Sequence, residues 1–244
     1  MSAASDATPK QPQEVLIVLC QDQSGSMMSV RKQTIDGFNE YIGGLKKDTN
    51  GRYLMTLIQF ATSGAAIEKS WKMPFESLPI AEVPDLTEET YLPTGNTPLY
   101  DAVGAAIRSS EKVANGRPVL MVIQTDGQEN ASREWSYKAV RDLIEEKQKP
   151  GSLWTVVFMG ADMDAWAVAQ GLGVQMSNTV RYRGDQTGAV YRVLRAATSN
   201  YAVANSGDLE EAEEIKGKFW IGQEVEKAMK DAGWVPKQDS SSSK

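Results

Sequence analysis

A short polar stretch that follows an apolar run carries side chains suited to binding a hard metal ion. Val15–Leu19 is continuously apolar, and the sequence DQSGS follows at residues 22–26. Asp22, Ser24 and Ser26 alternate along the chain, so an extended loop would direct all three side chains the same way. Carboxylate and hydroxyl oxygens suit Mg²⁺, Mn²⁺ or Ca²⁺ and do not suit zinc or copper. Taken alone, the same residues also fit a helix N-cap in an ordinary strand-to-helix turn.

Two further segments carry oxygen-bearing side chains next to predicted elements. In TGNTPLYDA (residues 94–102), Thr97 fits a helix N-cap and Pro98 fits the first turn of the helix. In VIQTDGQEN (residues 122–130), Asp126 follows a second apolar run. A segment such as TDGQEN is, by itself, more typical of a turn than of a metal site.

Apolar runs alternate with segments of helical periodicity along most of the chain. We predict strands at 15–19, 52–60, 119–123, 152–161 and 175–182, the first and third of them buried, and helices at 28–45, 97–114, 132–148, 162–171 and around 190–201. Residues 65–73 are predicted to form a hairpin partner of the second strand, and residues 74–96 a loop rich in proline and acids. This order predicts an α/β fold: a doubly wound, mainly parallel sheet with helices on both faces.

Such folds bind ligands beyond the carboxyl ends of their strands. The polar loop after Leu19, the start of the helix at Thr97 and the loop at Asp126 all lie at that edge of the predicted sheet. We therefore expect the three segments to converge.

The composition restricts the chemistry that is open to this chain. Its 244 residues, 41% of them hydrophobic, are enough for one full α/β domain. The absence of histidine excludes histidine-based catalytic triads, zinc sites that use histidine, and a histidine general base. Cys20 has no partner for an internal disulfide and fits a small buried side chain in a reducing compartment. The formal charge of −6 does not favour nucleic acid or anionic lipid as a partner.

Other metal, nucleotide and catalytic sites fail on spacing. A calcium loop of the EF-hand type counted from Asp22 would need glycine and glutamate where the chain has Met27 and Gln33. No glycine-rich phosphate loop ending in lysine is present. A phosphatase of the haloacid dehalogenase family would use Asp22 as nucleophile, but Ser24 replaces the aspartate expected as its acid/base. We expect no enzymatic activity.

The three polar segments together resemble the von Willebrand factor A (vWA) domain family, over about residues 14–205. DQSGSM matches the family's Asp-x-Ser-x-Ser signature, and TGNTPLYDA and VIQTDGQEN match its second and third loops in the same order. The resemblance implies a mainly parallel sheet with one antiparallel edge strand. It also implies a metal-ion-dependent adhesion site (MIDAS), in which Ser24, Ser26 and Thr97 ligate Mg²⁺ through their hydroxyls. Asp22 and Asp126 would hold the ion directly or through water, and Mn²⁺ or Ca²⁺ could replace it.

This resemblance implies a metal-dependent, adhesion-type module that binds another protein, whose Asp or Glu completes the metal shell. An alternative is a structural subunit of a larger assembly, such as a phage virion, which uses the same fold as a scaffold. We expect a cytoplasmic protein, or a virion component under the alternative, with no membrane span because Val15–Cys20 is far shorter than about 20 residues. The expected organisation is a flexible arm at 1–13, a vWA-like domain at 14–205, an acidic helical appendage at 206–235 and a flexible tail at 236–244.

Overall fold

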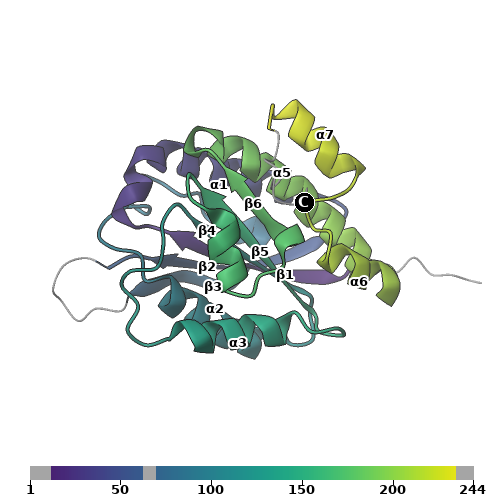
Figure 1. Cartoon of the computed structure of the whole chain (residues 1–244). Coiled ribbons are helices and arrows are strands. Elements are labelled where there is room, and N and C mark those ends of the chain that lie inside the picture. Colours follow the sequence, from purple (N-terminus) through teal and green to yellow (C-terminus); the bar gives the residue numbers. More distant parts are fainter. Residues whose placement is uncertain (1–11, 63–69, 235–244) are drawn as a thin grey trace, which may run out of the picture.

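The centre of the molecule is a six-stranded sheet with the strand order β3-β2-β1-β4-β5-β6 (Figure 1). It is seen in a computed structural model that describes residues 12–62 and 70–234. Neighbouring strands pair in parallel, except that β3 runs antiparallel to β2 at one edge. The strands are β1 (Glu14–Asp22), β2 (Arg52–Phe60), β3 (Trp71–Pro79), β4 (Val119–Thr125), β5 (Trp154–Ala161) and β6 (Thr179–Tyr182). The predicted α/β sheet with one antiparallel edge strand is confirmed.

Helices cover both faces of the sheet, and each face has its own apolar cluster. Side chains of α1 and α5 belong to one cluster, and side chains of α2, α3 and α4 belong to the other. The α-helices are α1 (Arg31–Leu45), α2 (Leu99–Ala114), α3 (Tyr137–Lys147), α4 (Ala165–Gly171), α5 (Thr187–Ser206), α6 (Leu209–Lys216) and α7 (Gln223–Asp231). Short 3-10 helices lie at Gly25–Val30, Ile80–Glu82, Met176–Asn178 and Gly184–Gln186.

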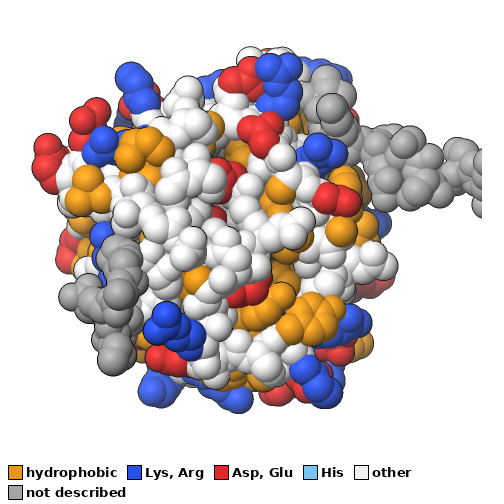
Figure 2. All heavy atoms as spheres, turned by 60° about the vertical axis from the view of Figure 1, so that its left-hand side comes forward, with side chains coloured by type: hydrophobic (Ala, Val, Ile, Leu, Met, Phe, Trp, Pro, Cys, Tyr) orange, Lys and Arg blue, Asp and Glu red, His pale blue; other side chains and the backbone are white. Residues whose placement is uncertain are grey.

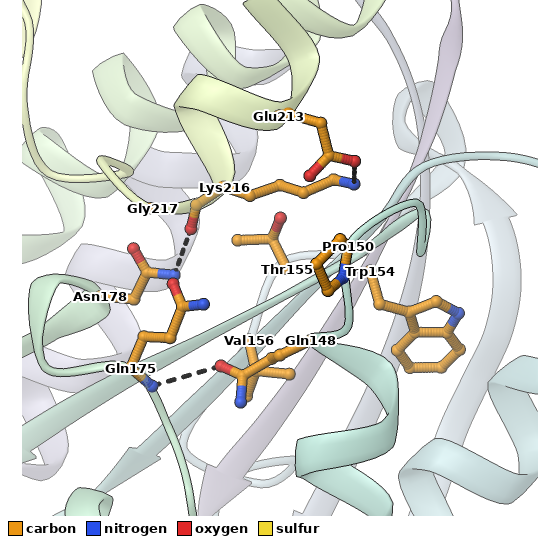
Figure 3. Close-up of a pocket in the computed structure, with 10 residues that line it drawn as sticks. All are labelled: Gln148, Pro150, Trp154, Thr155, Val156, Gln175, Asn178, Glu213, Lys216 and Gly217. Atoms are coloured by element: carbon orange, nitrogen blue, oxygen red, sulfur yellow. Dashed lines mark hydrogen bonds and ion pairs between the residues drawn. The ribbon is translucent and has the colours of Figure 1, made fainter. Parts of the chain in front are cut away.

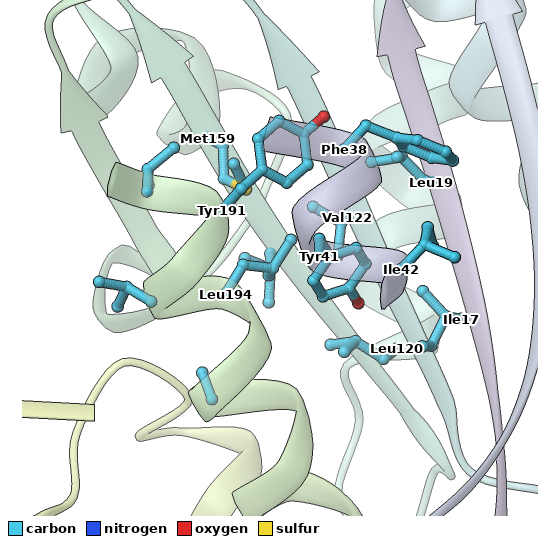
Figure 4. Packing of buried hydrophobic residues seen from close by; sticks show 14 of the residues in the cluster. Ile17, Leu19, Phe38, Tyr41, Ile42, Leu120, Val122, Met159, Tyr191 and Leu194 are labelled. Atoms are coloured by element: carbon cyan, nitrogen blue, oxygen red, sulfur yellow. The ribbon is translucent and has the colours of Figure 1, made fainter. Parts of the chain in front are cut away.

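Strand β1 shows why the central strands are apolar runs without alternation. Successive side chains of a strand point to opposite faces, and here both faces are covered. Ile17 and Leu19 pack towards α1 and α5, among the residues drawn in Figure 4, whereas Leu16 and Val18 pack towards α2. The strands therefore form the rigid base from which the polar loops extend.

The edge strand β3 corrects part of the sequence prediction. A hairpin partner of β2 was expected at 65–73 and a loop from 74 onward, but β3 runs from Trp71 to Pro79; residues 63–69 lie outside the described part of the chain. Pro74 and Pro79 argued for a loop because proline cannot donate to a sheet ladder. At an edge strand one side of the backbone has no partner strand, so proline is tolerated there.

The segment after α5 packs against the domain core. Phe219, Trp220, Val225 and Trp234 are buried in the same apolar cluster as α5. Ring contacts join Tyr201 of α5 to Phe219, with centroids 6.2 Å apart, and continue to the two tryptophans. The region predicted as an acidic helical appendage thus contains α6 and α7, which cover one side of α5. Of the predicted flexible ends, 1–11 and 236–244 lie outside the described residues.

Across residues 12–62 and 70–234, none of the helices combines the length and the apolar character that crossing a bilayer requires.

Candidate metal site

The parallel register brings the ends of β1 and β4 together. Gln21 pairs with Gln124, so Asp22 and Thr125 end their strands side by side. The Thr125 hydroxyl donates to Asp22 Oδ2 at 2.5 Å, and the backbone N–H of Ser24 donates to Asp22 Oδ1 at 2.7 Å. Both oxygens of the buried Asp22 carboxylate are therefore held in one orientation.

A short chain of hydrogen bonds links the first loop to the third. Ser24 Oγ and Ser26 Oγ lie 3.2 Å apart, and Ser26 Oγ donates to Asp126 Oδ1 at 2.6 Å. Ser24 is buried whereas Ser26 is exposed, so the group of oxygens opens to solvent on the Ser26 side. The structure thus brings together four of the five predicted ligands by direct contacts.

The fifth, Thr97, lies in the second loop and faces the same group. Its N–H donates to Asn130 Oδ1 at 2.8 Å, and the N–H of Asn130 donates back to Thr97 O at 3.1 Å. A carbon added at the Cα of Gly127 would lie 3.2 Å from Thr97 Oγ1 and 3.9 Å from Ser26 Oγ. The two hydroxyls therefore converge on Gly127, and Thr97 Oγ1 has no hydrogen-bond partner among the described residues.

Backbone hydrogen bonds join the first loop to the second. The N–H of Thr94 donates to Gln23 O at 2.8 Å, and the N–H of Gly25 donates to Gly95 O at 3.0 Å. A Cβ at Gly25 would lie 3.3 Å from Gly95 O, so glycine is needed there for the close approach of the two loops.

Two local predictions were wrong in detail. Ser26 lies in the 3-10 helix Gly25–Val30 and not in an extended loop, yet its hydroxyl still meets that of Ser24. Thr97 does not cap α2, which begins at Leu99 after Pro98. Instead, groups from the third loop occupy the first N–H groups of that helix: the Glu129 carboxylate accepts from Tyr100 N and the Ser132 hydroxyl accepts from Asp101 N. The Thr97 hydroxyl is thereby left available for another partner.

The third loop is shaped by two carboxylates that the sequence analysis did not single out. The buried Asp101 accepts hydrogen bonds from the N–H groups of Arg133, Glu134 and Trp135 and from the hydroxyl of Ser70. Glu129 accepts from the N–H groups of Ala131 and Ser132 and from the Ser132 hydroxyl. Residues that accept hydrogen bonds from backbone N–H groups have no characteristic spacing in a sequence. The signal that could have revealed these two is that each is an acid within a loop motif: Asp101 in TGNTPLYDA and Glu129 in VIQTDGQEN.

A chain of buried hydrogen bonds lies directly beneath the site. Gln59 donates to Gln21 at 3.1 Å, and Gln21 donates to the hydroxyl of Tyr191 on α5 at 3.2 Å. Tyr191 donates to Gln124 at 2.6 Å, and Gln124 donates to the hydroxyl of Tyr182 at 3.3 Å. Gln21 and Gln124 immediately precede Asp22 and Thr125, so this chain fixes the strand ends that carry the site.

The electrostatics of the site favour a cation. Burial raises the pKa of Asp22 to about 6, although hydrogen bonds from Thr125 and Ser24 oppose this. Burial also raises the pKa of Asp126, and the nearby Asp162 carboxylate adds to it. The charged side chains that act on these two groups are themselves acidic, and a positive ion would relieve both effects.

The donor set fits a hard divalent cation. Two carboxylates and three hydroxyls supply oxygen ligands, and Mg²⁺ commonly combines one or two carboxylates with water or other oxygens. Within the described residues no three or more of His, Cys, Asp and Glu form a metal cluster, so a cation here depends on the hydroxyls of Ser24, Ser26 and Thr97.

The surface around the site is neutral and polar. The strands' carboxyl ends point to the left in Figure 1, and Figure 2 brings this side forward. The middle of that face is largely white, with recessed acidic groups and adjacent apolar patches, whereas Lys and Arg lie mostly near the outline.

A separate hollow of about 170 Å³ lies at the opposite edge of the sheet, where β5 begins (Figure 3). Its polar groups are engaged with one another: Asn178 Nδ2 donates to Lys216 O at 2.6 Å, and Gln148 Oε1 accepts from Gln175 N at 3.2 Å. The first bond ties α6 to the 3-10 helix that precedes β6, and the second ties the end of α3 to the segment before that 3-10 helix, which indicates a structural role.

Comparisons with known proteins identify the fold. No protein-family model matches the sequence, and no curated protein matches it. Proximal thread matrix protein 1 (PTMP1) from the mussel byssus is 12% identical, with a TM-score of 0.53 over 81% of this chain and 49% of that one. The pilus adhesin SpaC from Lactobacillus rhamnosus GG is 12% identical, with a TM-score of 0.57 over 80% of this chain and 30% of that one.

A third structure matches over most of its own length. The vWF domain of the type V pili tip protein Mfa5 from Porphyromonas gingivalis is 9% identical, with a TM-score of 0.51, and the match covers 75% of this chain and 94% of that one. By contrast, this chain spans about half the length of PTMP1 and under a third of SpaC. Together with the strand order and the single antiparallel edge strand, these likenesses show that the chain has the fold of a von Willebrand factor A-type domain.

Proposed function

We propose that this domain binds another protein through a divalent metal ion, with Mg²⁺ as the expected ion. The hydroxyls of Ser24, Ser26 and Thr97 would ligate the ion, and Asp22 and Asp126 would hold it directly or through water. The observation that carries the proposal is the convergence of hydroxyl and carboxylate oxygens from three separate loops: Ser24, Ser26 and Asp126 are joined by direct contacts, and the Thr97 hydroxyl lies beside Gly127 with that of Ser26.

The choice of hydroxyl ligands gives the site its binding role. Neutral hydroxyls leave much of the charge of the ion uncompensated, and Mg²⁺ seeks six oxygens in near-octahedral array. A carboxylate from a partner protein can displace a water from the ion and supply the missing charge. The partner is therefore expected to present an Asp or Glu.

Binding also suits this site better than catalysis does. The Asp22 carboxylate, the candidate nucleophile of a phosphatase, is buried and held at both oxygens by Thr125 and Ser24. A carboxylate held in this way is a poor nucleophile for a phosphorus atom, and position 24 provides a hydroxyl where such an enzyme needs an acid.

The structural neighbours support the proposal. SpaC is a pilus adhesin, and one PTMP1 structure has a zinc-occupied MIDAS motif. Because that motif holds zinc, the metal preference of this chain should be measured with Zn²⁺ and Mn²⁺ as well as Mg²⁺.

Isothermal titration of the full chain with MgCl₂ tests the metal site. We expect one site in the wild-type protein and a loss of affinity of about tenfold or more in Ser26→Ala and Thr97→Val. Ser109→Ala is the matched control, because the Ser109 hydroxyl bonds to Ala106 O within α2, away from the site. Equal Mg²⁺ binding by all four proteins, or binding by none, would contradict the proposal.

The double variant Ser24→Ala plus Ser26→Ala separates the two functions considered from the sequence. A binding module loses capture of its partner in this variant, as it does in EDTA. A scaffold subunit would assemble normally under both conditions.

A further inference from the structure

An apolar hollow lies next to the candidate metal site. It has a volume of about 290 Å³ and is enclosed by the start of α2, the loop after β4, and the facing sides of α3 and α4. Leu99, Tyr100, Tyr137 and Val168 form much of its wall. Sites for small molecules measure about 300–1,000 Å³. This hollow lies at the lower end of that range, so we expect it to accept a group no larger than one side chain.

Two loops connect the wall of the hollow to residues of the metal site. Tyr100 is three residues from Thr97, Glu129 is three residues from Asp126, and the N–H of Tyr100 donates to Glu129 Oε2 at 2.9 Å. Three residues of extended chain reach at most about 10 Å. A peptide segment anchored at the metal can therefore place a nearby side chain in the hollow.

The chemistry of the wall selects the kind of side chain. The rings of Tyr100 and Tyr137 lie 5.9 Å apart at 60°, and Tyr137 is 42% exposed, so ring surface is accessible. Among the described residues that line the hollow, Glu129 is the one with a charged side chain. Its carboxylate already accepts hydrogen bonds from Tyr100, Ala131 and Ser132. The hollow thus offers aromatic and aliphatic surface with little unsatisfied charge.

We propose that the partner segment carries a large aromatic side chain about three residues from its metal-binding acid, and that this ring enters the hollow. An incoming ring can make tilted contacts with the two tyrosines, which aromatic side chains prefer to flat sandwiches. This inference rests on the proposed function, because the acid at the metal sets the position of the segment. It goes further by naming a second determinant of recognition.

A basic side chain is the competing occupant. A guanidinium could lie over a tyrosine ring, but Glu129 has no free oxygen pair to receive it. Selection of Arg or Lys in place of an aromatic residue would therefore overturn the inference.

Selection from a random peptide library tests both steps. The full-length chain is immobilised in buffer with MgCl₂, a phage-displayed library is panned, and bound phage are eluted with EDTA. We expect enriched peptides to share an Asp or Glu and, at a fixed spacing, Phe, Tyr or Trp. Failure to enrich any acid-containing peptide contradicts the proposed function, whereas enrichment of acids without an aromatic residue contradicts only this inference.

Two variants of one helix locate the aromatic determinant. Ala167 is an exposed residue of α4 that lines the hollow, so Ala167→Trp should fill it; Gln170→Trp places the same ring on α4 outside the described wall. Affinities for a selected peptide and for its version with alanine at the aromatic position are measured by fluorescence anisotropy. The wild type and Gln170→Trp should prefer the aromatic peptide by about tenfold, and Ala167→Trp should bind both peptides equally.

Tyr137→Ala provides an independent check that does not depend on filling the hollow. It should also reduce the preference for the aromatic peptide while leaving Mg²⁺ affinity unchanged in the titration. A full tenfold preference in both Ala167→Trp and Tyr137→Ala would place the aromatic contact elsewhere and overturn the inference.

Discussion

At the scale of single residues, the site depends on a glycine that has no side chain to crowd the candidate ligand oxygens. Gly127 lies beside the hydroxyls of Thr97 and Ser26, and its N–H donates to the Thr125 hydroxyl at 3.1 Å. Thr125 in turn holds Asp22. One threonine hydroxyl therefore fixes both the buried carboxylate of the first loop and the backbone of the third.

Gly127→Ala should weaken metal binding with little effect on folding. The added methyl would lie 3.2 Å from Thr97 Oγ1 and displace that hydroxyl, while the backbone at this position is not in the left-handed region. We expect the dissociation constant for Mg²⁺ to rise about tenfold or more, and the free energy of unfolding to change by less than about 1 kcal/mol.

Gly43→Ala is the control for that substitution. A Cβ at Gly43 meets nothing within 4 Å, in the interior of α1. This variant should be more stable by about 0.5–1 kcal/mol in urea denaturation and should bind Mg²⁺ like the wild type. Unchanged Mg²⁺ affinity in Gly127→Ala would show that Thr97 Oγ1 is not a ligand.

The residues of the site differ in how far the sequence could predict them. The order and spacing of three polar loops predicted Asp22, Ser24, Ser26, Thr97 and Asp126, and the structure brings these side chains to one place; whether they ligate a metal remains a prediction. Thr125, Asn130 and Asp101 were missed because each acts by accepting or donating bonds across the fold. The residue type of such a group can be read from the sequence, but the partners that it meets are set by the tertiary structure.

At the scale of elements, the parallel strands were predictable and the edge was not. Four parallel strands are buried on both faces, and each therefore appears in the sequence as a short apolar run that predicts a strand: β1, β2, β4 and β5. β3 is partly exposed and contains two prolines, so local preference and tertiary pairing disagree there. Tertiary contacts also override local preference at the start of α2. Thr97 looked like the cap of this helix, but the helix begins at Leu99 and its first N–H groups bond to Glu129 and Ser132.

The hydrogen-bonded chain beneath the site couples α5 to the strand ends. The hydroxyl of Tyr191 accepts from Gln21 and donates to Gln124, so one atom joins a helix to the two central strands. All three side chains are buried. A buried amide that loses its partner pays the cost of its lost hydration.

Tyr191→Phe should therefore lower stability out of proportion to the single oxygen removed. The variant leaves one buried donor and one buried acceptor unpaired, and we expect a loss of about 1–3 kcal/mol for each in urea denaturation. Tyr137→Phe is the control, because the hydrogen bond of the Tyr137 hydroxyl within the described part of the chain is the one that it accepts from exposed Arg141 at 3.4 Å. A loss below about 0.5 kcal/mol in Tyr191→Phe would mean that water satisfies the two glutamines.

At the scale of the whole molecule, the chain after α5 contributes to the core. Phe219 and Trp220 lie in the apolar cluster of the sheet face that α1 and α5 cover, although the sequence between 208 and 234 is rich in acids and interrupted by glycine. The acids face solvent on α6 and α7, and four aromatic or aliphatic residues supply the buried side. Sparse apolar residues at irregular spacing give a weak helical pattern, so the contact with α5 could not be read from periodicity.

Phe219→Ala should destabilise the entire domain by about 3–5 kcal/mol, as is usual for a buried phenylalanine. Leu209→Ala is the control on the same segment, because Leu209 is 85% exposed, and it should change stability by less than about 0.5 kcal/mol. Unfolding followed by far-ultraviolet circular dichroism and by tryptophan fluorescence should give coincident transitions. A separate early transition confined to α6 and α7 would show that they form an independent appendage.

The proposed ion would act on the whole fold because its ligands are distant in the sequence. Residues 22–26, 97 and 126 lie on loops that follow different strands, so an ion that binds all three only in the folded state must stabilise that state. At a Mg²⁺ concentration one hundred times the dissociation constant, the gain is about 2.7 kcal/mol, which corresponds to a rise in Tm of about 5–11 °C for a chain of this size. The rise should vanish on addition of EDTA and in Ser26→Ala, and persist in Ser109→Ala; an equal rise in Ser26→Ala would place the stabilising ion at another site.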